Sequence, residues 1–410
     1  MKTLYISYFG ALKPLSHSQV IPYLCGLAHQ GIGVTLMSFE EALHDPEEEA
    51  RRRAALASEL QRQGIHWVPL RYHKRPSFPA TAFDVAVGVV VAAYLVLRHR
   101  MDVIHARNHI PALIGLIVRA LVRCKLVFDL RGVMAEEYAE AGVWKTGSLP
   151  FRAIKWVERR ALASADAIVM LTHRIHEALR QTSVGLSSNR APVEIIPSCV
   201  DTDRYRGIDR SAARSLLGFG DDTVLAYAGS LGGWYMSSEM VDFLIVARQR
   251  LPRVHFMVLT QSSFDLIERE LRTRGVGRDR YSLRTVDPAS MAMHLAAADV
   301  GLSFIRAGYS KWSSSPTKIG EYLASGLPVV TSAGIGDVDE MVQSDGVGIT
   351  IDAFTSSAYL AAAERLADLL GEGPSLRERC RRTADRRLSL ERVGWPGYRR
   401  VYQSLEAGRR

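Results

Sequence analysis

Residues 313–332 read Ser-Ser-Ser-Pro-Thr-Lys-Ile-Gly-Glu-Tyr-Leu-Ala-Ser-Gly-Leu-Pro-Val-Val-Thr-Ser, and this stretch predicts a short helix followed by a buried strand. Ser315 is a favourable N-cap, and Pro316 suits the first helical position, where a missing N–H costs nothing. Three apolar residues recur at the i, i+3, i+4 spacing of one helix face: Ile319, Tyr322 and Leu323. Gly326 suits the left-handed position that ends a helix, and residues 327–331 then predict the strand.

The start of this helix combines several features that bind a phosphate group. Serine and threonine hydroxyls precede it, its first backbone N–H groups lack helical partners, and Lys318 adds an ammonium to its first turn. Glu321, one turn further along, can accept hydrogen bonds from sugar hydroxyls. A nucleoside diphosphate would satisfy both ends of this arrangement, and a capped surface helix with ordinary charges is the alternative.

The same stretch resembles the donor-site helix of retaining glycosyltransferases of family 4, which have the GT-B architecture. In that family a Glu-x(7)-Glu pattern precedes the run Ala-x-Gly-x-Pro-Val-Val, which residues 324–330 match. The second Glu holds the donor ribose and matches Glu321. The first Glu touches the transferred sugar, and Ser313 stands in its place. A branch of the family with Pro-x-Lys-x-x-Glu-Tyr-Leu-Ala resembles this chain more closely. The Lys of that motif, which matches Lys318, is a regular feature of the branch.

The composition fits a large folded protein of two or three domains. Of the 410 residues, 47% are apolar and 23% are charged, which is enough for a sizeable core. Four widely spaced cysteines without a Cys-x-x-Cys pattern indicate neither a zinc site nor a disulfide framework, so a reducing cytoplasm is the expected location. The first residues read as a strand, and we expect no signal peptide.

The net charge of +9 indicates an anionic partner, which leaves nucleic acid, anionic lipid and anionic small molecules. No RNA- or DNA-binding signature accompanies the basic clusters, so no nucleic-acid partner is expected. Residues 85–97 form the longest apolar run, which at 13 residues is shorter than the span of about 20 that a bilayer requires. We interpret this run as a buried helix, and we leave open a peripheral contact with an anionic membrane at its inner face.

Local patterns in the first half predict several elements. Residues 2–8 read as a strand, residues 11–18 as a loop and residues 19–30 as a helix, which together begin a doubly wound sheet. A charged helix is expected over 46–62, with Asp45 as its N-cap. Residues 77–79 read as a loop before the apolar helix at 85–97.

Polar side chains follow two neighbouring strands of the predicted first sheet. Residues 102–107 read Asp-Val-Ile-His-Ala-Arg and residues 128–132 read Phe-Asp-Leu-Arg-Gly, with Glu136 and Glu137 soon after. In open α/β sheets, ligands bind beyond the carboxyl ends of the strands. The two strand ends therefore predict a site, with ordinary loop polar groups as the alternative.

In the same branch of family 4 these segments read Asp-x-Ile-His-x-Arg, Phe-Asp-x-Arg-Gly and Glu-Glu or Asp-Glu, and this face lines the acceptor side of the cleft. The resemblance and the strand-end positions give three catalytic candidates: His105, Arg131 and Glu137. Three further residues are acceptor-side candidates: Arg107, Asp129 and Glu136. A buried ion-pair network of Asp129, Arg131 and Glu137 is the alternative for this group.

The second half begins with a strand and the turn Gly-Ser-Leu-Gly-Gly at 229–233. Most of the family has Gly-Arg-Leu and a nearby Lys here, and both cations hold the diphosphate, but Ser230 replaces the Arg. The two glycines at 232 and 233 still allow backbone N–H groups to approach a phosphate. Lys318 is therefore the first candidate for the diphosphate cation, with Lys311 and Arg306 behind it. The complete set of donor-binding candidates is Gly10, Gly229, Ser230, Gly232, Ser313, Ser315, Thr317, Lys318 and Glu321.

These observations predict an α/β fold of GT-B architecture, with two Rossmann-like doubly wound domains facing a cleft. Residues 1–190 are expected to form the acceptor-side domain and residues 191–385 the nucleotide-sugar donor domain. Residues 386–410 are expected to form a helix that returns to the first domain. No G-x-G-x-x-G follows the first strand, so a dinucleotide cofactor is not expected.

The resemblance implies a retaining glycosyltransferase of the hexosyltransferase type. It would move a sugar from a nucleotide-diphosphate donor to a hydroxyl of a sugar, glycan or lipid-linked acceptor, in glycan, cell-envelope polysaccharide or glycoconjugate biosynthesis. No metal is expected, because Asp201-Thr202-Asp203 lies between the domains and not at a strand end. Two alternatives remain: a nucleotide-sugar epimerase, which the acids and bases of the first half allow, and a non-catalytic glycan-binding relative, which Ser230 and Ser313 allow.

Overall fold

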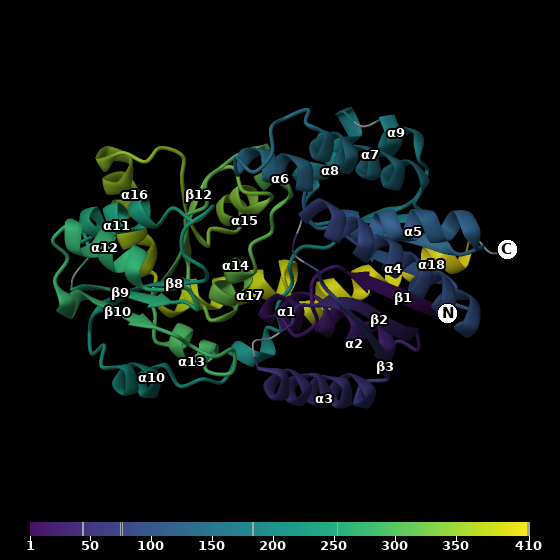
Figure 1. Cartoon of the computed structure of the whole chain (residues 1–410). Helices are drawn as coiled ribbons and strands as arrows, with labels where there is room; N and C mark the ends of the chain where they lie inside the picture. Colours follow the sequence, from purple (N-terminus) through teal and green to yellow (C-terminus); the bar gives the residue numbers. More distant parts are fainter. Residues whose placement is uncertain (43–44, 74, 76, 183, 252, 408–410) are drawn as a thin grey trace. The chain divides into compact units, whose positions relative to one another are not determined.

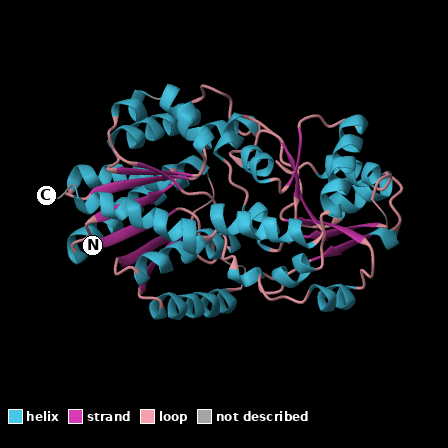
Figure 2. Ribbon diagram, turned by 180° about the vertical axis from the view of Figure 1, so that it is seen from behind, coloured by secondary structure: helices cyan, strands magenta, loops and turns pink. Residues whose placement is uncertain are grey.

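The computed structural model describes residues 1–42, 45–73, 75, 77–182, 184–251 and 253–407, and the chain divides into two compact units. The first unit consists of Met1–Pro197 and Val393–Arg410, and the second consists of Ser198–Arg392. Both units are parallel sheets with covering helices (Figures 1 and 2). The predicted boundaries at 190 and 386 lie a few residues before the observed ones.

The first unit is built on a seven-stranded parallel sheet with the strand order β3-β2-β1-β4-β5-β6-β7. The strands are β1 (Lys2–Ser7), β2 (Gly33–Glu40), β3 (Ile65–Arg71), β4 (Val103–Arg107), β5 (Lys125–Leu130), β6 (Ala167–Met170) and β7 (Val193–Ile195). Its central strands are buried on both faces, as expected when helices cover a parallel sheet on each side.

The helices of the first unit are α1 (Pro14–Gln19), α2 (Ile21–His29), α3 (Pro46–Arg62), α4 (Ser77–His99), α5 (His109–Leu121), α6 (Met134–Glu140), α7 (Leu149–Ser164), α8 (His173–Thr182), α9 (Val184–Ser188) and α18 (Trp395–Ala407). Helix α3 begins where predicted, because the Asp45 carboxylate accepts hydrogen bonds from the Glu47 and Glu48 backbone N–H groups at 2.9 and 3.4 Å. The loop predicted over 11–18 is wrong, since it contains α1.

Helix α4 is longer than the sequence pattern predicted. It begins at Ser77, so the predicted loop at 77–79 is wrong, and Pro79 fits because it falls in the first turn, where backbone N–H groups need no helical partner. Among the described residues, one helical segment, 78–99, is long and apolar enough by length and composition to cross a membrane, with 39% of its most apolar window buried. A Cβ on Gly88 would lie 2.7 Å from Ile114 Cδ1, so α4 packs closely on α5.

The last helix, α18, belongs to the first unit, as predicted. It packs on α2, β6 and β7. Trp395 Nε1 donates to the Pro22 carbonyl at 2.9 Å, and a Cβ on Gly26 would lie 2.1 Å from the Trp395 ring. Only a glycine at position 26 therefore lets the indole lie against α2.

The second unit contains a six-stranded parallel sheet with the order β10-β9-β8-β11-β12-β13. The strands are β8 (Thr223–Ala228), β9 (Val254–Leu259), β10 (Tyr281–Arg284), β11 (Val300–Ser303), β12 (Val329–Ser332) and β13 (Gly348–Ile351). The helices are α10 (Arg210–Leu217), α11 (Ser237–Ala247), α12 (Asp265–Thr273), α13 (Met291–Ala296), α14 (Thr317–Ala324), α15 (Val338–Asp345), α16 (Ser356–Gly371) and α17 (Pro374–Arg387). Two short 3-10 helices lie in the loops of this unit: η1 (Asp203–Tyr205) precedes α10, and η3 (Tyr309–Ser313) lies between β11 and α14.

Candidate functional site

Helix α14 is fixed against the second sheet by one buried tyrosine. Tyr322 Oη accepts from the Ala228 backbone N–H at 2.7 Å and donates to the Leu302 carbonyl at 3.2 Å. A Cβ on Gly301 would lie 2.2 Å from the Tyr322 ring, so only a glycine there allows this close packing. Gly326 ends the helix with φ +79°, as predicted. The helix therefore meets the carboxyl ends of β8 and β11, where ligands bind in open α/β sheets.

The predicted N-cap of α14 is wrong. Pro316 occupies the N-cap position with extended backbone, and no side chain caps this end among the described residues. Ser315 Oγ instead accepts from the Ser198 backbone N–H at 3.0 Å, and the buried Ser313 Oγ donates to the Ser310 carbonyl at 2.6 Å. These two hydroxyls stabilise the loop before the helix, and Thr317 is the first helical residue.

Lys318 is a buried ammonium held among aromatic rings. Its side chain is 7% exposed, and its Nζ lies 4.1 and 4.2 Å from the ring centroids of Tyr227 and Tyr235. Within the described part of the chain, this Nζ has no hydrogen-bond acceptor. Burial lowers the pKa of Lys318 to about 7, and the Glu321 carboxylate opposes this shift. The site therefore holds a buried amine that can take up a proton near neutral pH and whose N–H groups have no acceptor among the described residues.

The glycine-rich turn after β8 lies beside this lysine. A Cβ on Gly229, whose φ is +141°, would lie 2.7 Å from Lys318 Nζ. Gly232 and Gly233 have φ of +78° and +61°, a conformation that residues with a Cβ rarely adopt. The exposed Ser230 has its carbonyl hydrogen-bonded by Tyr227 Oη. The structure thus brings Lys318 together with the predicted glycine turn, 229–233.

Glu321 lies one helical turn from Lys318 and receives a hydrogen bond from Tyr205 of η1. Burial raises the pKa of Glu321, whereas the Tyr205 hydroxyl and the Lys318 ammonium counteract the rise. The tyrosines at 205, 227 and 235 were not predicted to be site residues, because the spacing of apolar residues cannot distinguish a buried ring from one that contacts a cation. Of the other predicted cations, Lys311 lies 3.8 Å from the Trp234 ring centroid and Arg306 is exposed.

In the first unit, His105 does not occupy a strand end, and this prediction is wrong. It lies in the middle of β4, its side chain is 0% exposed, and its Nδ1 is hydrogen-bonded to Tyr402 Oη at 3.0 Å. Its Nε2 lies 3.6 Å from Asp129 Oδ2. Burial lowers the pKa of His105, so the ring is neutral at pH 7. The side chain is part of the core beneath α18.

Asp129 is the centre of a buried ionic network. Its carboxylate accepts from Tyr398 Oη at 2.8 Å, and lies 3.5 Å from Arg107 Nη1 and 3.6 Å from Arg131 Nη1. Burial alone would raise the pKa of Asp129, but the nearby Arg131, His105 and Arg107 outweigh it and hold this pKa well below its usual range. The arrangement is that of a structural ion-pair cluster, which the sequence analysis had left open as the alternative for Asp129 and Arg131.

The two glutamates of α6 lie in different surroundings. Glu136 pairs with Lys155 Nζ at 2.8 Å, and Lys155 also pairs with the buried Glu158. Glu137 lies over the preceding turn, since a Cβ on Gly132 would be 2.6 Å from Glu137 Oε1. The structure therefore does not bring Glu136 and Asp129 into one cluster.

The loop at Gly10 is held by a residue that the sequence analysis missed. The buried Glu40, at the end of β2, accepts hydrogen bonds from the Ala11 and Leu12 backbone N–H groups at 2.6 and 3.3 Å, and from Ser38 Oγ at 2.6 Å. A Cβ on Gly10 would lie 2.6 Å from Glu40 Oε2. Gly10 is thus required by the close approach of a carboxylate, which no local pattern indicates.

A second missed group lies at the carboxyl edge of the first sheet. Tyr8 follows β1, His73 follows β3, and both contact the buried Asp84 of α4. The Asp84 carboxylate is 2.6 Å from His73 Nδ1 and accepts from Tyr8 Oη at 2.9 Å and from the His73 backbone N–H at 3.0 Å. His73 is partly exposed, so its other ring nitrogen is available to a ligand while Asp84 fixes the ring.

Two family descriptions match the chain: "Glycosyl transferase 4-like domain" over residues 22–199 and "Glycosyl transferases group 1" over residues 222–369. A curated relative, alpha-D-kanosaminyltransferase of Streptomyces kanamyceticus, is 24% identical over 236 residues. That match spans 55% of this chain and 56% of the relative.

Several solved structures share the fold. HepE of Anabaena, in complex with UDP and glucose, has a TM-score of 0.72 and 16% identity, over 99% of this chain and 100% of that one. Sucrose-phosphate synthase from Thermosynechococcus elongatus has a TM-score of 0.73 and 16% identity over 100% of both chains. WaaG, a glycosyltransferase involved in lipopolysaccharide biosynthesis, has a TM-score of 0.68 and 16% identity, over 97% of this chain and 98% of that one.

These matches and the two parallel sheets confirm the predicted fold and define the class of the molecule. Each half of the chain is thus similar to a glycosyltransferase domain, and the fold is that of GT-B proteins.

Proposed function

We propose that this chain is a retaining, family 4-type hexosyltransferase that transfers a sugar from a nucleoside-diphosphate donor to an acceptor hydroxyl. The observation that carries the proposal is the buried Lys318, which lies beside the Gly229 turn and one helical turn from Glu321. The similar fold of HepE, which was solved in complex with UDP and glucose, gives independent support for a donor of this kind.

In this proposal the second unit stabilises the diphosphate leaving group. Lys318 supplies one positive charge, and the N-terminus of α14 and the 229–233 turn supply backbone N–H groups. Glu321 accepts hydrogen bonds from the ribose hydroxyls, and Tyr205 orients its carboxylate. Charge neutralisation of a phosphate leaving group needs no covalent intermediate with the protein.

Replacing Glu321 with Ala is expected to weaken nucleoside-diphosphate binding by about 1.5–3 kcal/mol, because a charge-assisted hydrogen bond is lost. Calorimetric titration of the variant measures this. Tyr205→Phe is the matched control, since it keeps the carboxylate and removes only its orienting hydroxyl, and it should lose less. Unchanged affinity in a folded Glu321→Ala protein would show that the ribose is bound elsewhere.

Because Lys318 fills the role of the diphosphate cation, we expect transfer to persist when divalent metals are chelated. Initial rates with and without EDTA should agree within about twofold. A complete loss of activity that manganese restores would contradict the proposed role of Lys318.

We further propose that the His73–Asp84 pair acts on the acceptor side, where it can exchange a proton with the acceptor hydroxyl. Proton transfer by a positioned side chain contributes about 10²–10⁴-fold to a rate, so His73→Ala should lower kcat by roughly this factor and leave donor affinity unchanged. His29→Ala is the matched control, because His29 contacts the exposed Gln63 side chain, outside this group. Equal kcat values for the two variants would exclude His73. Glu137, at the start of α6, is the other candidate for this proton transfer.

The acceptor is proposed to be a glycan or a lipid-linked sugar that is reached at a membrane surface. Five large apolar side chains of α4 are exposed: Phe78, Phe83, Val90, Tyr94 and Leu97. The opposite side of α4 packs on α5, so the contact would be peripheral. Cosedimentation with phosphatidylglycerol vesicles should be lost in a Val90→Asp/Leu97→Asp variant that remains folded. If the variant and the parent protein sediment equally, α4 is not the membrane contact.

The proposed function is tested by incubating the chain with radiolabelled nucleotide sugars and candidate acceptors. A thermal-shift panel of UDP, GDP, ADP and TDP selects the donor base first. A labelled product with the anomeric configuration of the donor, read by NMR, is the expected result. Interconversion of the nucleotide sugar without an acceptor would instead indicate the epimerase, and binding without turnover would indicate a glycan-binding relative.

A further inference from the structure

The second unit contains a cavity of about 460 Å³ at the edge of the sheet where the strands begin. Ala296 and Ser325, at the C-terminal ends of α13 and α14, form part of its wall. Five arginines line it: Arg206, Arg210, Arg377, Arg381 and Arg392. Two carboxylates also line it, those of Glu378 and Asp385, so the lining carries an excess of three positive charges. Lys318 and the glycine turn lie at the other edge, where the strands end.

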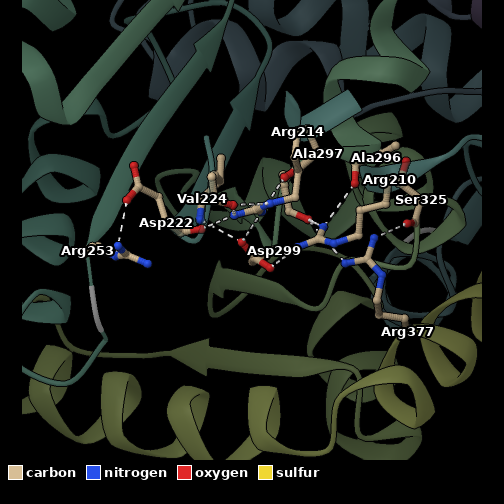
Figure 3. Close-up of polar contacts among 12 residues, drawn as sticks. Arg210, Arg214, Asp222, Val224, Arg253, Ala296, Ala297, Asp299, Ser325 and Arg377 are labelled. Atoms are coloured by element: carbon tan, nitrogen blue, oxygen red, sulfur yellow. Dashed lines mark hydrogen bonds and ion pairs between the residues drawn. The ribbon is translucent and has the colours of Figure 1, made fainter. Parts of the chain in front are cut away.

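Two of the five arginines have carboxylate partners. Arg206 pairs with Asp385. Arg210 Nη2 donates to Asp299 Oδ1 at 2.6 Å, but the same carboxylate also binds Arg214 Nη1 at 3.1 Å (Figure 3). The single negative charge of Asp299 thus faces two guanidinium groups, so it cannot neutralise both of them.

Arg377 is held in the cavity wall by backbone oxygens alone. Its guanidinium donates to the Ala298 and Ser325 carbonyls at 3.3 and 3.1 Å (Figure 3). Among the described residues, no carboxylate pairs with it. Burial, together with the like charges of Arg210 and Arg381, lowers the pKa of Arg377 to about 10, and the nearby Asp299 carboxylate opposes this shift. A guanidinium is protonated at pH 7 at this pKa, so the repulsion within the cavity is not relieved by loss of a proton.

Arg381 and Arg392 have no ion-pair partner within the described ranges of the chain. The Arg381 guanidinium lies against Gly326, where a Cβ would be 3.1 Å from Arg381 Cζ. Gly326 therefore both ends α14 and leaves room for this side chain. Arg210 Nη1 also donates to the Ala296 and Ala298 carbonyls, so backbone oxygens hold both Arg210 and Arg377 in place. These contacts give no reason for Arg381 and Arg392 to line the same cavity.

We propose that this cavity binds an oxyanion of the phosphate class, as inorganic phosphate or as the phosphate of a larger molecule. Guanidinium groups are planar and donate two parallel N–H groups, a geometry that matches the oxygens of a phosphate. A dianion in the cavity would compensate most of the excess charge of the lining. The cavity shares one lining residue, Tyr205, with the surroundings of Glu321. Its arginines lie at the opposite sheet edge from Lys318, so the proposal does not depend on the proposed donor site.

The test is calorimetric titration of the full chain with inorganic phosphate at low ionic strength, in a Lys318→Met background so that the donor site does not contribute. We expect one binding site, and we expect Arg381→Gln/Arg392→Gln to raise its Kd by about tenfold or more. Neither arginine makes an ion pair, so the variant should keep the parent Tm. The matched control is Arg250→Gln/Arg269→Gln, which removes two charges from the same unit outside the cavity and should leave Kd unchanged.

Sedimentation with phosphatidylglycerol vesicles distinguishes the source of the phosphate, and it is done in the Val90→Asp/Leu97→Asp background, which removes the proposed α4 contact. Binding to vesicles that is lost in the Arg381/Arg392 variant identifies a lipid headgroup, and binding to inorganic phosphate alone identifies a soluble ligand. Both results support the site. The proposal is overturned if neither probe binds, or if the cavity and control variants lose affinity equally, because general surface charge would then explain the binding.

Discussion

Replacing Lys318 with Met is expected to weaken nucleoside-diphosphate binding by about 2–5 kcal/mol and to leave binding of the bare nucleoside unchanged. The loss is large because the ammonium is buried beside the Gly229 turn and has no hydrogen-bond acceptor within the described part of the chain. Methionine fills a similar volume between Tyr227 and Tyr235, so the site should keep its shape. Calorimetric titration with the two ligands measures the difference.

The same residue predicts the pH dependence of donor binding. With a pKa of about 7, Lys318 is half protonated at neutral pH in the free protein, and the diphosphate binds its charged form. Affinity should therefore fall as the pH rises above 7, by up to about tenfold per unit, with uptake of a proton on binding. In Lys318→Met this dependence should disappear. Lys311→Met is the matched control, and a loss of diphosphate affinity in that variant instead would assign the cation to Lys311.

The second large effect concerns stability. Asp129→Ala is expected to destabilise the first unit by about 3–5 kcal/mol, because it leaves Arg107 and Arg131 buried without a counter-charge. Urea denaturation followed by circular dichroism measures this, and Tyr398→Phe, which removes one hydrogen bond to the same carboxylate, should cost only about 1 kcal/mol. A variant with normal stability but impaired transfer would return Asp129 to the acceptor-side candidates.

The Asp129 network also makes the free energy of unfolding depend on pH in a defined direction. The pKa of Asp129 is held below its ordinary value in the folded chain, so the unfolded chain binds the proton first as the pH falls. Its contribution to stability should be complete above about pH 4 and should be lost at lower pH. Asp129→Ala should therefore lose the acid-dependent part of its unfolding free energy relative to the parent chain.

Local chemistry was enough to predict most of the secondary structure. The Asp45 cap and Pro46 placed the start of α3 correctly, and the glycine at 326 placed the end of α14. Predictions failed where a contact distant in sequence decided the conformation. Ser315 has the chemistry of an N-cap, but its hydroxyl binds the backbone of Ser198, and so the helix begins after Pro316 without it.

The candidate site was predictable on the donor side and less so on the acceptor side. Lys318 and Glu321 lie on one short helix, so their spacing alone places them together. His105 was assigned to a strand end because the strand was expected to stop early, whereas β4 continues to Arg107 and α18 covers the histidine. The His73–Asp84 pair joins two elements by a tertiary contact, which no local spacing reveals.

The attachment of α18 to the first unit has a consequence for biosynthesis. Tyr398 and Tyr402 complete the surroundings of Asp129 and His105, yet they leave the ribosome 269 and 297 residues after those partners. Until the whole second unit has been translated, the polar groups of Asp129 and His105 in the amino-terminal sheet therefore lack these two hydrogen-bond partners. A chain truncated near position 393 would lack these two tyrosines, and Asp129 and His105 would lose their partners. We therefore expect such truncated chains to be bound by chaperones or degraded.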